Sequence, residues 1–276
     1  MTADEALRQA TRRLSASPSA RLDAEVLLMH AHGVDRTWLY TWGDRELPAE
    51  SAARFEALIE RRVAGWPVAY LTGRREFWGL ELDTSPATLI PRPDTERLVE
   101  AALEVATTAR GTLLDLGTGT GAVALAFASE RPGWRVLGVD VEPQAVALAS
   151  ANGTRLGLDN ARFVESDWFS ALAGERFTII VSNPPYIDAD DPHLGRDDVR
   201  FEPRRALVAA DAGLADLRAL VVSAPAFLEP GGWLWLEHGH TQAGAMRALL
   251  GDAGYGQIAS LTDLGGRERV SGGRWG

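Results

Sequence analysis

Two consecutive prolines follow an apolar run in the stretch 181-VSNPPYID-188. Proline cannot donate to a sheet ladder, and it keeps the residue before it out of helical geometry. Asn183-Pro184-Pro185-Tyr186 therefore predicts a stiff corner at the end of a buried strand. Such a corner holds one amide side chain, two backbone carbonyls and one aromatic ring in fixed relative positions, which suits the binding of a small planar group.

A glycine-rich loop, 115-DLGTGTG-121, lies between an earlier apolar run and a helical stretch. Glycine permits a tight turn and a close approach of the backbone to a ligand. The spacing of Gly117, Gly119 and Gly121 departs from the dinucleotide pattern G-x-G-x-x-G, and the loop has no lysine to hold a phosphate. With Thr118 and Thr120, these glycines predict a site for a ligand without phosphates. A purely structural turn is the alternative.

Acidic and aromatic residues follow the next two apolar runs. Asp140 is placed to accept hydrogen bonds from both hydroxyls of a ribose, although it could instead cap the helix expected at 142–149. Asp167 offers an acceptor for the exocyclic amine of adenine, and Trp168 offers an apolar wall for its ring, although either could also serve as a cap or in packing. A ribose and an adenine without phosphates favour S-adenosylmethionine over NAD.

The corner then has a chemical use. If the glycine loop binds a methyl donor, the corner faces the methyl group, and the acceptor is a planar nitrogen with a delocalised lone pair. The side-chain oxygen of Asn183 and the carbonyl of Pro184 can each accept one N–H, which favours pyramidal nitrogen and stabilises the developing positive charge. Tyr186 can pack on the planar group and hold it in line. A plain turn is the alternative function of the corner.

Strands and helices alternate from about residue 111, and this rhythm predicts a parallel sheet with both faces covered. The expected strands are 112–117, 134–140, 161–166, 177–183 and 232–239, and the tail predicts two more antiparallel strands at 256–264 and 267–275. This α/β pattern predicts a doubly covered domain over residues 93–276.

The first 75 residues predict a small bundle of short helices. Thr2-Ala3-Asp4-Glu5 has the pattern of a capping box, and Gly33 is an expected helix stop. Residues 76–92 predict a β-hairpin between the two domains, with 76–83 running out and 87–90 running back. Asp94 or Thr95 is then expected to cap the next helix.

Composition limits the possible chemistry. The chain has 276 residues, 46% of them hydrophobic, and it contains neither cysteine nor lysine, which excludes a disulfide, a thiolate nucleophile, a P-loop lysine and a Schiff base. The net charge is −10, with residues 1–75 at +1 and the remainder at −11, so a basic surface for nucleic acid is not expected. No apolar run reaches the length of a membrane span, and no signal peptide is found, so we expect a cytoplasmic protein without membrane contact.

Metal binding is not expected. His238 and His240 lie two residues apart after a buried strand, but no third ligand can be identified. A loop beside the substrate groove, or simple capping, is the preferred interpretation of these histidines.

The motifs resemble those of the bacterial peptide chain release factor glutamine N5-methyltransferases. The resemblance spans nearly the whole chain and is strongest in LIPRPDTE (89–96), LDLGTGTGAVALA (114–126), Asp140, SDWFSALAG (166–174), IVSNPPYID (180–188), DPHL (191–194), DVRFEP (198–203), ALVAADAGLAD (206–216) and LEHG (236–239). The NPPY tetrapeptide alone is shared with adenine-N6 DNA methylases.

The resemblance implies a Rossmann-like, seven-stranded class I methyltransferase domain joined to an N-terminal helical domain that docks the substrate protein. The methyl group would pass from S-adenosylmethionine to N5 of the glutamine in the Gly-Gly-Gln motif of class I release factors, giving S-adenosylhomocysteine. Gly117 through Gly121, Asp140, Trp168 and Asn183 would contact the cofactor. Asn183, Pro184, Pro185 and Tyr186 would hold the glutamine amide. We expect a monomer without direct nucleic-acid contact. Methylation of a ribosomal protein's glutamine, or of adenine N6 in nucleic acid, is the alternative.

Overall fold

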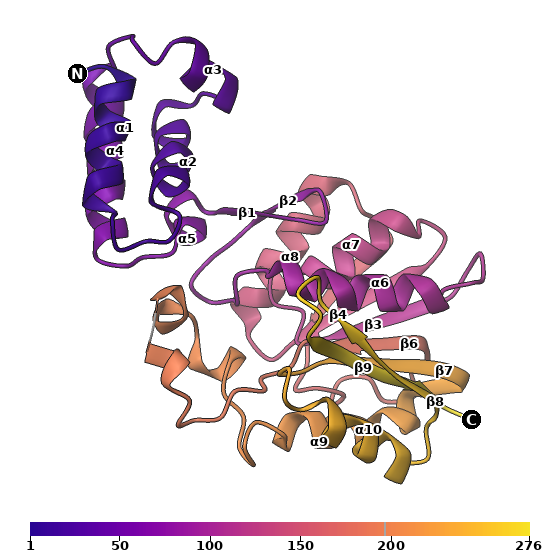
Figure 1. The fold of residues 1–276 in the computed structure, drawn as a ribbon. Helices are drawn as coiled ribbons and strands as arrows, with labels where there is room; N and C mark the ends of the chain where they lie inside the picture. The colour runs from indigo at the N-terminus through magenta and orange to yellow at the C-terminus, as the bar shows by residue number, and fades with distance from the viewer. Residues whose placement is uncertain (196) are drawn as a thin grey trace. The chain divides into compact units, whose positions relative to one another are not determined.

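A computed structural model describes residues 1–195 and 197–276 of the chain, which divide into two compact units. The first unit comprises Met1–Arg74 with Gly195–Phe201, and the second comprises Arg75–Leu194 with Glu202–Gly276. A short piece of the chain that follows the proline corner is thus part of the N-terminal unit. Figure 1 shows the elements of both units in chain order.

Five α-helices form the N-terminal unit within its described residues. They are α1 (Ala3–Arg13), α2 (Ala20–His32), α3 (Arg36–Thr41), α4 (Ala49–Val63) and α5 (Val68–Thr72), and the added piece contributes the 3-10 helix η3 (Asp197–Phe201). The predicted capping box at Thr2 and Glu5 is confirmed, because each side chain accepts from the other residue's backbone N–H. Gly33 ends α2 in the left-handed conformation, as its position predicts.

The N-terminal unit has an apolar core. The core gathers the inner faces of α1, α2 and α4, including Leu7, Leu27, Leu28 and Ile59. Together these side chains give the unit a hydrophobic core of its own.

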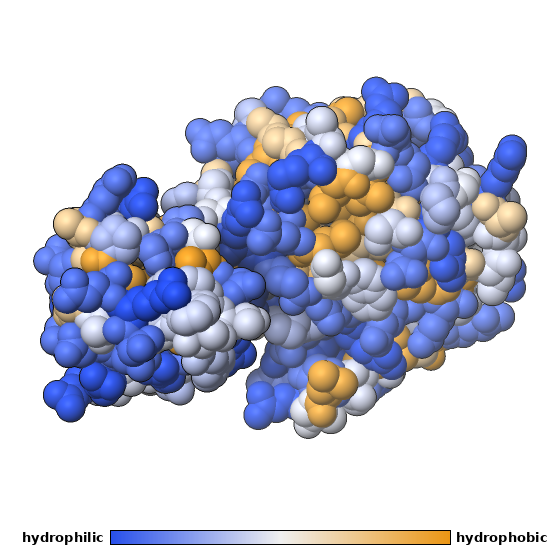
Figure 2. All heavy atoms as spheres, turned by 90° about the horizontal axis from the view of Figure 1, so that it is seen from above, coloured by the Kyte–Doolittle hydropathy of each residue, from blue (hydrophilic) through white to orange (hydrophobic). Residues whose placement is uncertain are grey.

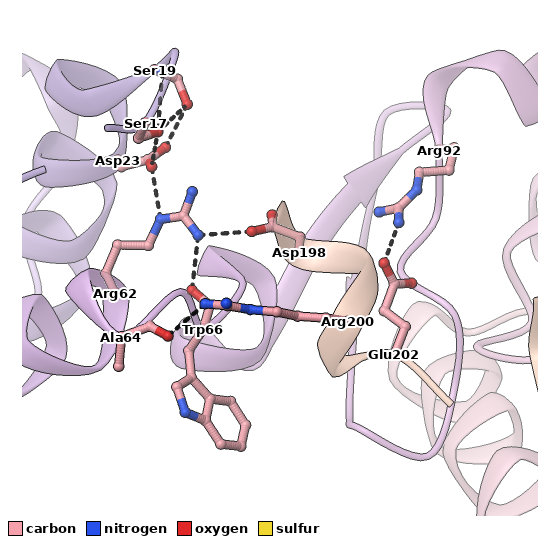
Figure 3. Close-up of polar contacts among 10 residues, drawn as sticks. All are labelled: Ser17, Ser19, Asp23, Arg62, Ala64, Trp66, Arg92, Asp198, Arg200 and Glu202. Atoms are coloured by element: carbon pink, nitrogen blue, oxygen red, sulfur yellow. Dashed lines mark hydrogen bonds and ion pairs between the residues drawn. The ribbon is translucent and has the colours of Figure 1, made fainter. Parts of the chain in front are cut away.

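Arg62 connects two acidic residues from distant parts of the chain inside this unit. Its guanidinium bonds Asp23 at 2.8 Å and Asp198 at 2.7 Å, as Figure 3 shows. Nearby, Arg200 donates to the backbone carbonyl of Ala64 at 2.8 Å. These charged hydrogen bonds attach the 3-10 helix η3 to the end of α4.

A two-stranded hairpin follows the first bundle. Strand β1 (Arg74–Phe77) pairs with β2 (Leu80–Asp83). Trp78 and Gly79 form the turn with φ of 55° and 71°, the left-handed pair that tight hairpins require. The expected return strand at 87–90 is wrong, because the chain already turns back at Trp78 and Gly79, and 87–90 has no strand.

The second unit is built on a seven-stranded sheet with the order β5-β4-β3-β6-β7-β9-β8. Its strands are β3 (Thr112–Leu116), β4 (Arg135–Asp140), β5 (Ala161–Glu165), β6 (Phe177–Ser182), β7 (Leu228–Glu237), β8 (Gly256–Thr262) and β9 (Glu268–Arg274). All neighbours from β5 to β7 pair in parallel, whereas β9 is antiparallel to both β7 and β8. The predicted parallel sheet with an antiparallel tail is confirmed, and this α/β arrangement is Rossmann-like.

Helices cover both faces of this sheet, as Figure 1 shows. They are α6 (Glu96–Val105), α7 (Ala122–Glu130), α8 (Pro143–Leu156), α9 (Ala215–Ser223) and α10 (Ala243–Asp252), with the short 3-10 helices η1 (Pro93–Thr95), η2 (Pro192–Gly195), η4 (Arg204–Ala206) and η5 (Ala224–Phe227). Successive strand residues enter opposite cores: Leu113 packs beneath α6 and α7, and Leu114 packs with α9 and α10.

The start of α6 differs from the expectation. Thr95 occupies the N-cap position, but neither it nor Asp94 makes a side-chain cap hydrogen bond. The Thr95 hydroxyl instead accepts a hydrogen bond from the Asn183 side chain, 88 residues away. The predicted cap is therefore wrong, because a tertiary partner competes for the same hydroxyl.

Hydrophilic side chains cover most of the face in Figure 2, and the hydrophobic residues on it lie in small separate groups. Among the described residues, no helix combines the length and the apolar character that a membrane crossing needs.

Candidate active site

A cavity of about 280 Å³ lies in the second unit at the carboxyl ends of β3, β4 and β6. Strand β3 pairs with β4 on one side and with β6 on the other, which makes this the point where the strand order reverses. Open α/β sheets bind ligands in the crevice at such a point. The lining includes residues of the glycine loop, the acidic residues after β4 and β5, and part of the proline corner: Gly117, Thr118, Gly119, Thr120, Asp140, Asp167, Trp168, Asn183 and Pro185.

The glycine loop depends on left-handed backbone. Gly117, Gly119 and Gly121 have φ of 71°, 56° and 82°, conformations that only glycine adopts without cost. At Gly119 an added Cβ would meet no atom within 4 Å, so the backbone there faces open space. At Gly121 it would meet Leu125, Ala149 and Phe163 at 3.0–3.2 Å. Gly121 does not line the cavity. It allows the neighbouring helices and strand to pack closely around it.

Asp140 is held by the backbone around it. Its Oδ2 accepts from the N–H of Gly119 and its Oδ1 from the N–H of Glu142, both at 2.9 Å. Burial raises the pKa of Asp140, whereas the backbone N–H of Gly119, the charge of Arg205 and the backbone N–H of Val141 act in the opposite direction. Each carboxylate oxygen keeps a second lone pair. Asp140 can therefore support the loop and accept hydrogen bonds from a diol at the same time.

Trp168 forms one wall of the cavity. It has φ of 47°, which is uncommon for an aromatic residue, and the hydroxyl of Ser166 donates to its carbonyl at 2.8 Å. A Cβ on Gly117 would lie 3.6 Å from the Trp168 ring. Asp167 lines the same cavity and is exposed. The turn thus presents a ring face and a carboxylate side by side.

Two acceptors of the proline corner have no partner within the described residues. The Asn183 Nδ2 donates to Thr95 Oγ1 at 3.2 Å, while no donor is found there for Asn183 Oδ1 or the carbonyl of Pro184. Asn183 and Pro185 line the cavity, and Pro184 is buried behind them. The two oxygens that a planar N–H₂ group would need are thus not engaged by this part of the protein.

Tyr186 lies outside the cavity lining, and its polar atoms are bonded within the fold. Its hydroxyl donates to Glu237 Oε1, and its carbonyl accepts from Gln242 Nε2, each at 3.1 Å. Burial, then the charge of Glu237, raises the pKa of Tyr186 well above its ordinary value. Its hydroxyl is therefore a fixed donor that anchors the corner to the end of β7.

Several lining residues were not expected from the sequence. Arg205 forms an ion pair with Glu142, beside Asp140. Asp216 lies near Asp167, and burial, followed by the charge of Asp167, raises the pKa of Asp216. Buried Asp115 accepts from the Thr118 hydroxyl at 2.7 Å, and burial raises its pKa to about 7. Asp115 could have been noticed as the acidic residue inside a buried strand. Arg205 and Asp216 give no local signal.

The segment 89–96 also contributes to the lining. Arg92 is ion-paired with Glu202, as Figure 3 shows. The second carboxylate oxygen of Glu202 accepts from the backbone N–H of Ile90 at 3.0 Å. The Glu202 side chain is fully buried. The RPDTE segment (92–96) thus lines the cavity through Arg92 and Thr95, and Arg92 also pairs with the chain that follows the proline corner.

His238, the first residue of the histidine pair, is bonded to protein groups through both ring nitrogens. His238 is buried, and its Nε2 and Nδ1 lie 2.7 Å from Ser271 Oγ and 2.9 Å from the Gly239 carbonyl. Burial lowers the pKa of His238. Both ring nitrogens are therefore occupied by protein groups.

Comparison with known proteins adds family evidence to this geometry. Residues 5–73 match the family model described as PrmC N-terminal domain, and residues 94–195 match the methyltransferase small domain. A release factor glutamine methyltransferase of Vibrio cholerae is 53% identical, over 100% of this chain and 97% of that protein. One from Pseudomonas aeruginosa is 55% identical, over 95% of each. A solved methyltransferase from Pyrococcus furiosus shares the fold, with a TM-score of 0.53 and 19% identity over 80% of this chain and 98% of that one.

The fold and the family model define an S-adenosylmethionine-dependent class I methyltransferase. Relatives that are about half identical to this chain over nearly its full length define the family within that class. The chain belongs to the release factor glutamine methyltransferases.

Proposed function

We propose that this enzyme methylates N5 of the glutamine in the Gly-Gly-Gln motif of class I release factors, and that the cavity of the second unit is where the reaction takes place. The observation that carries the proposal is the pair of unengaged acceptors in the proline corner. They are Asn183 Oδ1, on a residue that lines the cavity with the glycine loop and Asp140, and the carbonyl of Pro184, the next residue along the chain.

The lining fits S-adenosylmethionine by its chemistry. The open backbone at Gly119 suits a close approach of the ligand, Asp140 suits the ribose hydroxyls, and Trp168 with Asp167 suits the adenine. When bound, S-adenosylmethionine supplies a sulfonium methyl group as the electrophile. With Thr118 and Thr120, these residues would hold it, and Gly117 and Gly121 would shape the loop.

The corner prepares the acceptor nitrogen. A glutamine side chain has two amide N–H bonds, and Asn183 Oδ1 and the Pro184 carbonyl would each accept one of them. Both acceptors lie on a segment stiffened by two prolines, so they need little reorganisation as positive charge develops on nitrogen. The nitrogen forms a bond to the methyl carbon as the carbon–sulfur bond breaks, and it then loses one proton. No strong base is needed, because the N–H becomes acidic only after methylation.

Tyr186 has an indirect part in this proposal. Its hydroxyl is committed to Glu237, so the ring rather than the hydroxyl is available for packing beside Pro185 and the substrate. A fixed ring restricts the orientations of a planar group next to it.

Residues 1–75 serve as the docking domain for the release factor in this proposal, with 76–92 as the linker and 93–276 as the catalytic domain. The family model over residues 5–73 and the separate core of the first unit support this division of labour. Action on a protein of the translation machinery places the enzyme in the cytoplasm, and we propose that it acts as a monomer without direct nucleic-acid contact.

Mass spectrometry tests the proposal. The enzyme is incubated with S-adenosylmethionine and a purified release factor, and the tryptic peptide that contains Gly-Gly-Gln is sequenced. The expected result is a gain of one CH₂ group on the glutamine side chain. Transfer to a ribosomal protein or to duplex DNA at a matching or higher rate, in parallel reactions, would contradict it.

A further inference from the structure

Thr95 directs the side-chain amide of Asn183. It is 5% exposed, begins helix α6, and accepts the Asn183 Nδ2–H at 3.2 Å instead of capping the helix. An asparagine amide has a donor and an acceptor on the two branches of one plane. Because the nitrogen is engaged by Thr95, the oxygen is the branch left for a ligand.

Glu237 lies behind Thr95 and is buried, with 2% exposure. One of its oxygens, Oε1, accepts from the Tyr186 hydroxyl at 3.1 Å. The other, Oε2, is buried and has no partner with full hydrogen-bond geometry in the described part of the chain, while the Thr95 side chain lies close enough to lower the pKa of this carboxyl group. Thr95 therefore places a hydroxyl donor beside a buried carboxyl group that has one oxygen without a partner among the described residues.

The order of these groups fixes the direction of the hydrogen bonds. Above its pKa of about 7, the Glu237 carboxyl group is ionised and can only accept, so it takes the protons of Tyr186 and Thr95. A hydroxyl whose proton points to Glu237 can only accept from its other neighbour, which must then present an N–H. Asn183 therefore turns its nitrogen inward and its oxygen outward. A buried carboxylate is costly for stability, and this orientation gives it a function.

We propose that Thr95 and Glu237 are positioning residues that fix the Asn183 amide with its oxygen toward the substrate, and so select a carboxamide over a carboxylate. A glutamine N–H₂ can donate to Asn183 Oδ1, whereas a glutamate oxygen would face another oxygen. With the amide reversed, the preference reverses as well, because Asn183 would then present an N–H. The inference rests on the proposed function of the corner.

Further charged groups adjoin the series Glu237, Thr95 and Asn183, which we call the relay. Asp94 and Arg269 lie beside it as an ion pair at 3.5 Å, and Arg269 also bonds Asp263 at 3.1 Å. The positive charge of Arg269 acts on Glu237 and favours its ionised form, whereas Asp94 opposes it. Burial outweighs both and raises the pKa of Glu237 to about 7, so the hydrogen bonds run in this direction above about pH 7, and a neutral replacement at residue 237 is informative.

Glu237→Gln is the sharpest test. Glutamine has nearly the same shape, but its amide can donate to Thr95, which frees the Thr95 proton for Asn183 Oδ1 and reverses the relay. The expected protein is folded, with a melting temperature no lower than that of the wild type and unchanged affinity for S-adenosylmethionine, but with kcat on release factor reduced by about tenfold or more.

Selectivity is measured by binding, without turnover. Two release factors, one with glutamine and one with glutamate at the methylated position, are titrated against the enzyme saturated with S-adenosylhomocysteine. The wild type is expected to bind the glutamine form more tightly, and Glu237→Gln and Thr95→Val are expected to reduce that ratio by about tenfold, the usual size of one hydrogen-bond mismatch.

Thr95→Ser and Thr112→Val serve as controls. Serine keeps the hydroxyl, so its kcat and selectivity ratio should recover to near the wild-type values. Thr112→Val removes a hydroxyl that bonds Arg176 and Thr178 at the amino end of β3, and should change neither.

The outcomes separate the two hypotheses. If the wild type methylates no release factor, the proposed function is wrong, whatever the variants do. If the wild type is active but Glu237→Gln keeps both its kcat and its selectivity ratio, the relay is wrong. Equal losses in Thr95→Ser and Thr95→Val, with lowered melting temperatures, would also refute it, since Thr95 would then act only through packing.

Discussion

The hydroxyl of Tyr186 donates to Oε1 of Glu237 over 3.1 Å, and this bond ties the proline corner to the carboxyl end of strand β7. The hydroxyl of Tyr186 is thereby engaged within the fold. The ring is the part of this residue that the proposed packing on the substrate would use.

Tyr186→Phe should reduce stability in a pH-dependent way. The variant leaves a buried carboxylate with one donor fewer, so the free energy of unfolding is expected to fall by about 1–3 kcal/mol at pH 8. The loss should be smaller at pH 5, because Glu237, with a pKa raised to about 7, is then protonated. Urea unfolding at both pH values measures this, and an equal loss at both would show that the hydroxyl does not act through the carboxylate charge.

Glu237→Gln should change how stability depends on pH. Burial raises the pKa of Glu237 from 4.5 to about 7, so the folded state binds a proton that the unfolded state has released. The contribution of this proton to the free energy of unfolding is fully present below pH 4.5. About 3 kcal/mol of it is lost as the pH rises through 7.

The variant lacks that titration, so its stability should fall less steeply between pH 5 and pH 7 than that of the wild type. Asp115, whose pKa is also raised to about 7, remains in both proteins and provides the common background slope. Chemical denaturation at several pH values gives the two slopes. Superimposable slopes would mean that Glu237 does not titrate in this range.

Asn183→Ala should separate catalysis from cofactor binding. Losing one preorganised acceptor for the developing cation is expected to cost about 3 kcal/mol of transition-state stabilisation, or roughly a hundredfold in kcat. The Kd for S-adenosylmethionine should change much less, because Asp140 and Trp168 remain. Single-turnover methylation and calorimetry measure the two effects. Parental kcat in this variant would remove Asn183 from the mechanism.

Asp140→Ala should have the opposite profile. It removes the acceptors for the ribose hydroxyls and for the N–H groups of Gly119 and Glu142. The Kd for S-adenosylmethionine should rise by roughly ten- to a hundredfold, in line with the loss of charge-assisted hydrogen bonds. At saturating cofactor, kcat should stay near the wild-type value. A large fall in kcat with unchanged Kd would contradict the role proposed for Asp140.

Arg62→Met should destabilise the N-terminal unit. Arg62 and Asp23 are 11% and 9% exposed, so removing the arginine leaves a nearly buried carboxylate without its cation, at an expected cost of about 3 kcal/mol. The matched control is Arg54→Met, which breaks a pair with Glu50 in which the side chains are 56% and 82% exposed and should cost less than about 1 kcal/mol. Thermal and urea unfolding compare the two, and similar losses would show that burial does not set the cost.

Features that depend on local backbone chemistry were determined by the sequence alone. Gly117, Gly119 and Gly121 take the left-handed conformations for which their residue type is suited, and the capping box at Thr2 and Glu5 forms as its pattern predicts. The alternation of apolar runs gave the parallel sheet and placed Asp140 and Asn183 at strand ends. These features need only φ preferences, side-chain size and period, all of which act over a few residues.

Tertiary structure decided which polar groups meet across long stretches of chain. Thr95 was expected to cap its own helix, but its hydroxyl is taken by Asn183, and Tyr186 finds Glu237 at the end of another strand. The local sequence does not predict which partner a hydroxyl takes, because it can bond a backbone N–H of its own helix or a distant side-chain amide equally well. Only the register of β6 against β7 and the packing of α6 on the sheet bring the partners within hydrogen-bond distance, and so determine how the corner presents its oxygen.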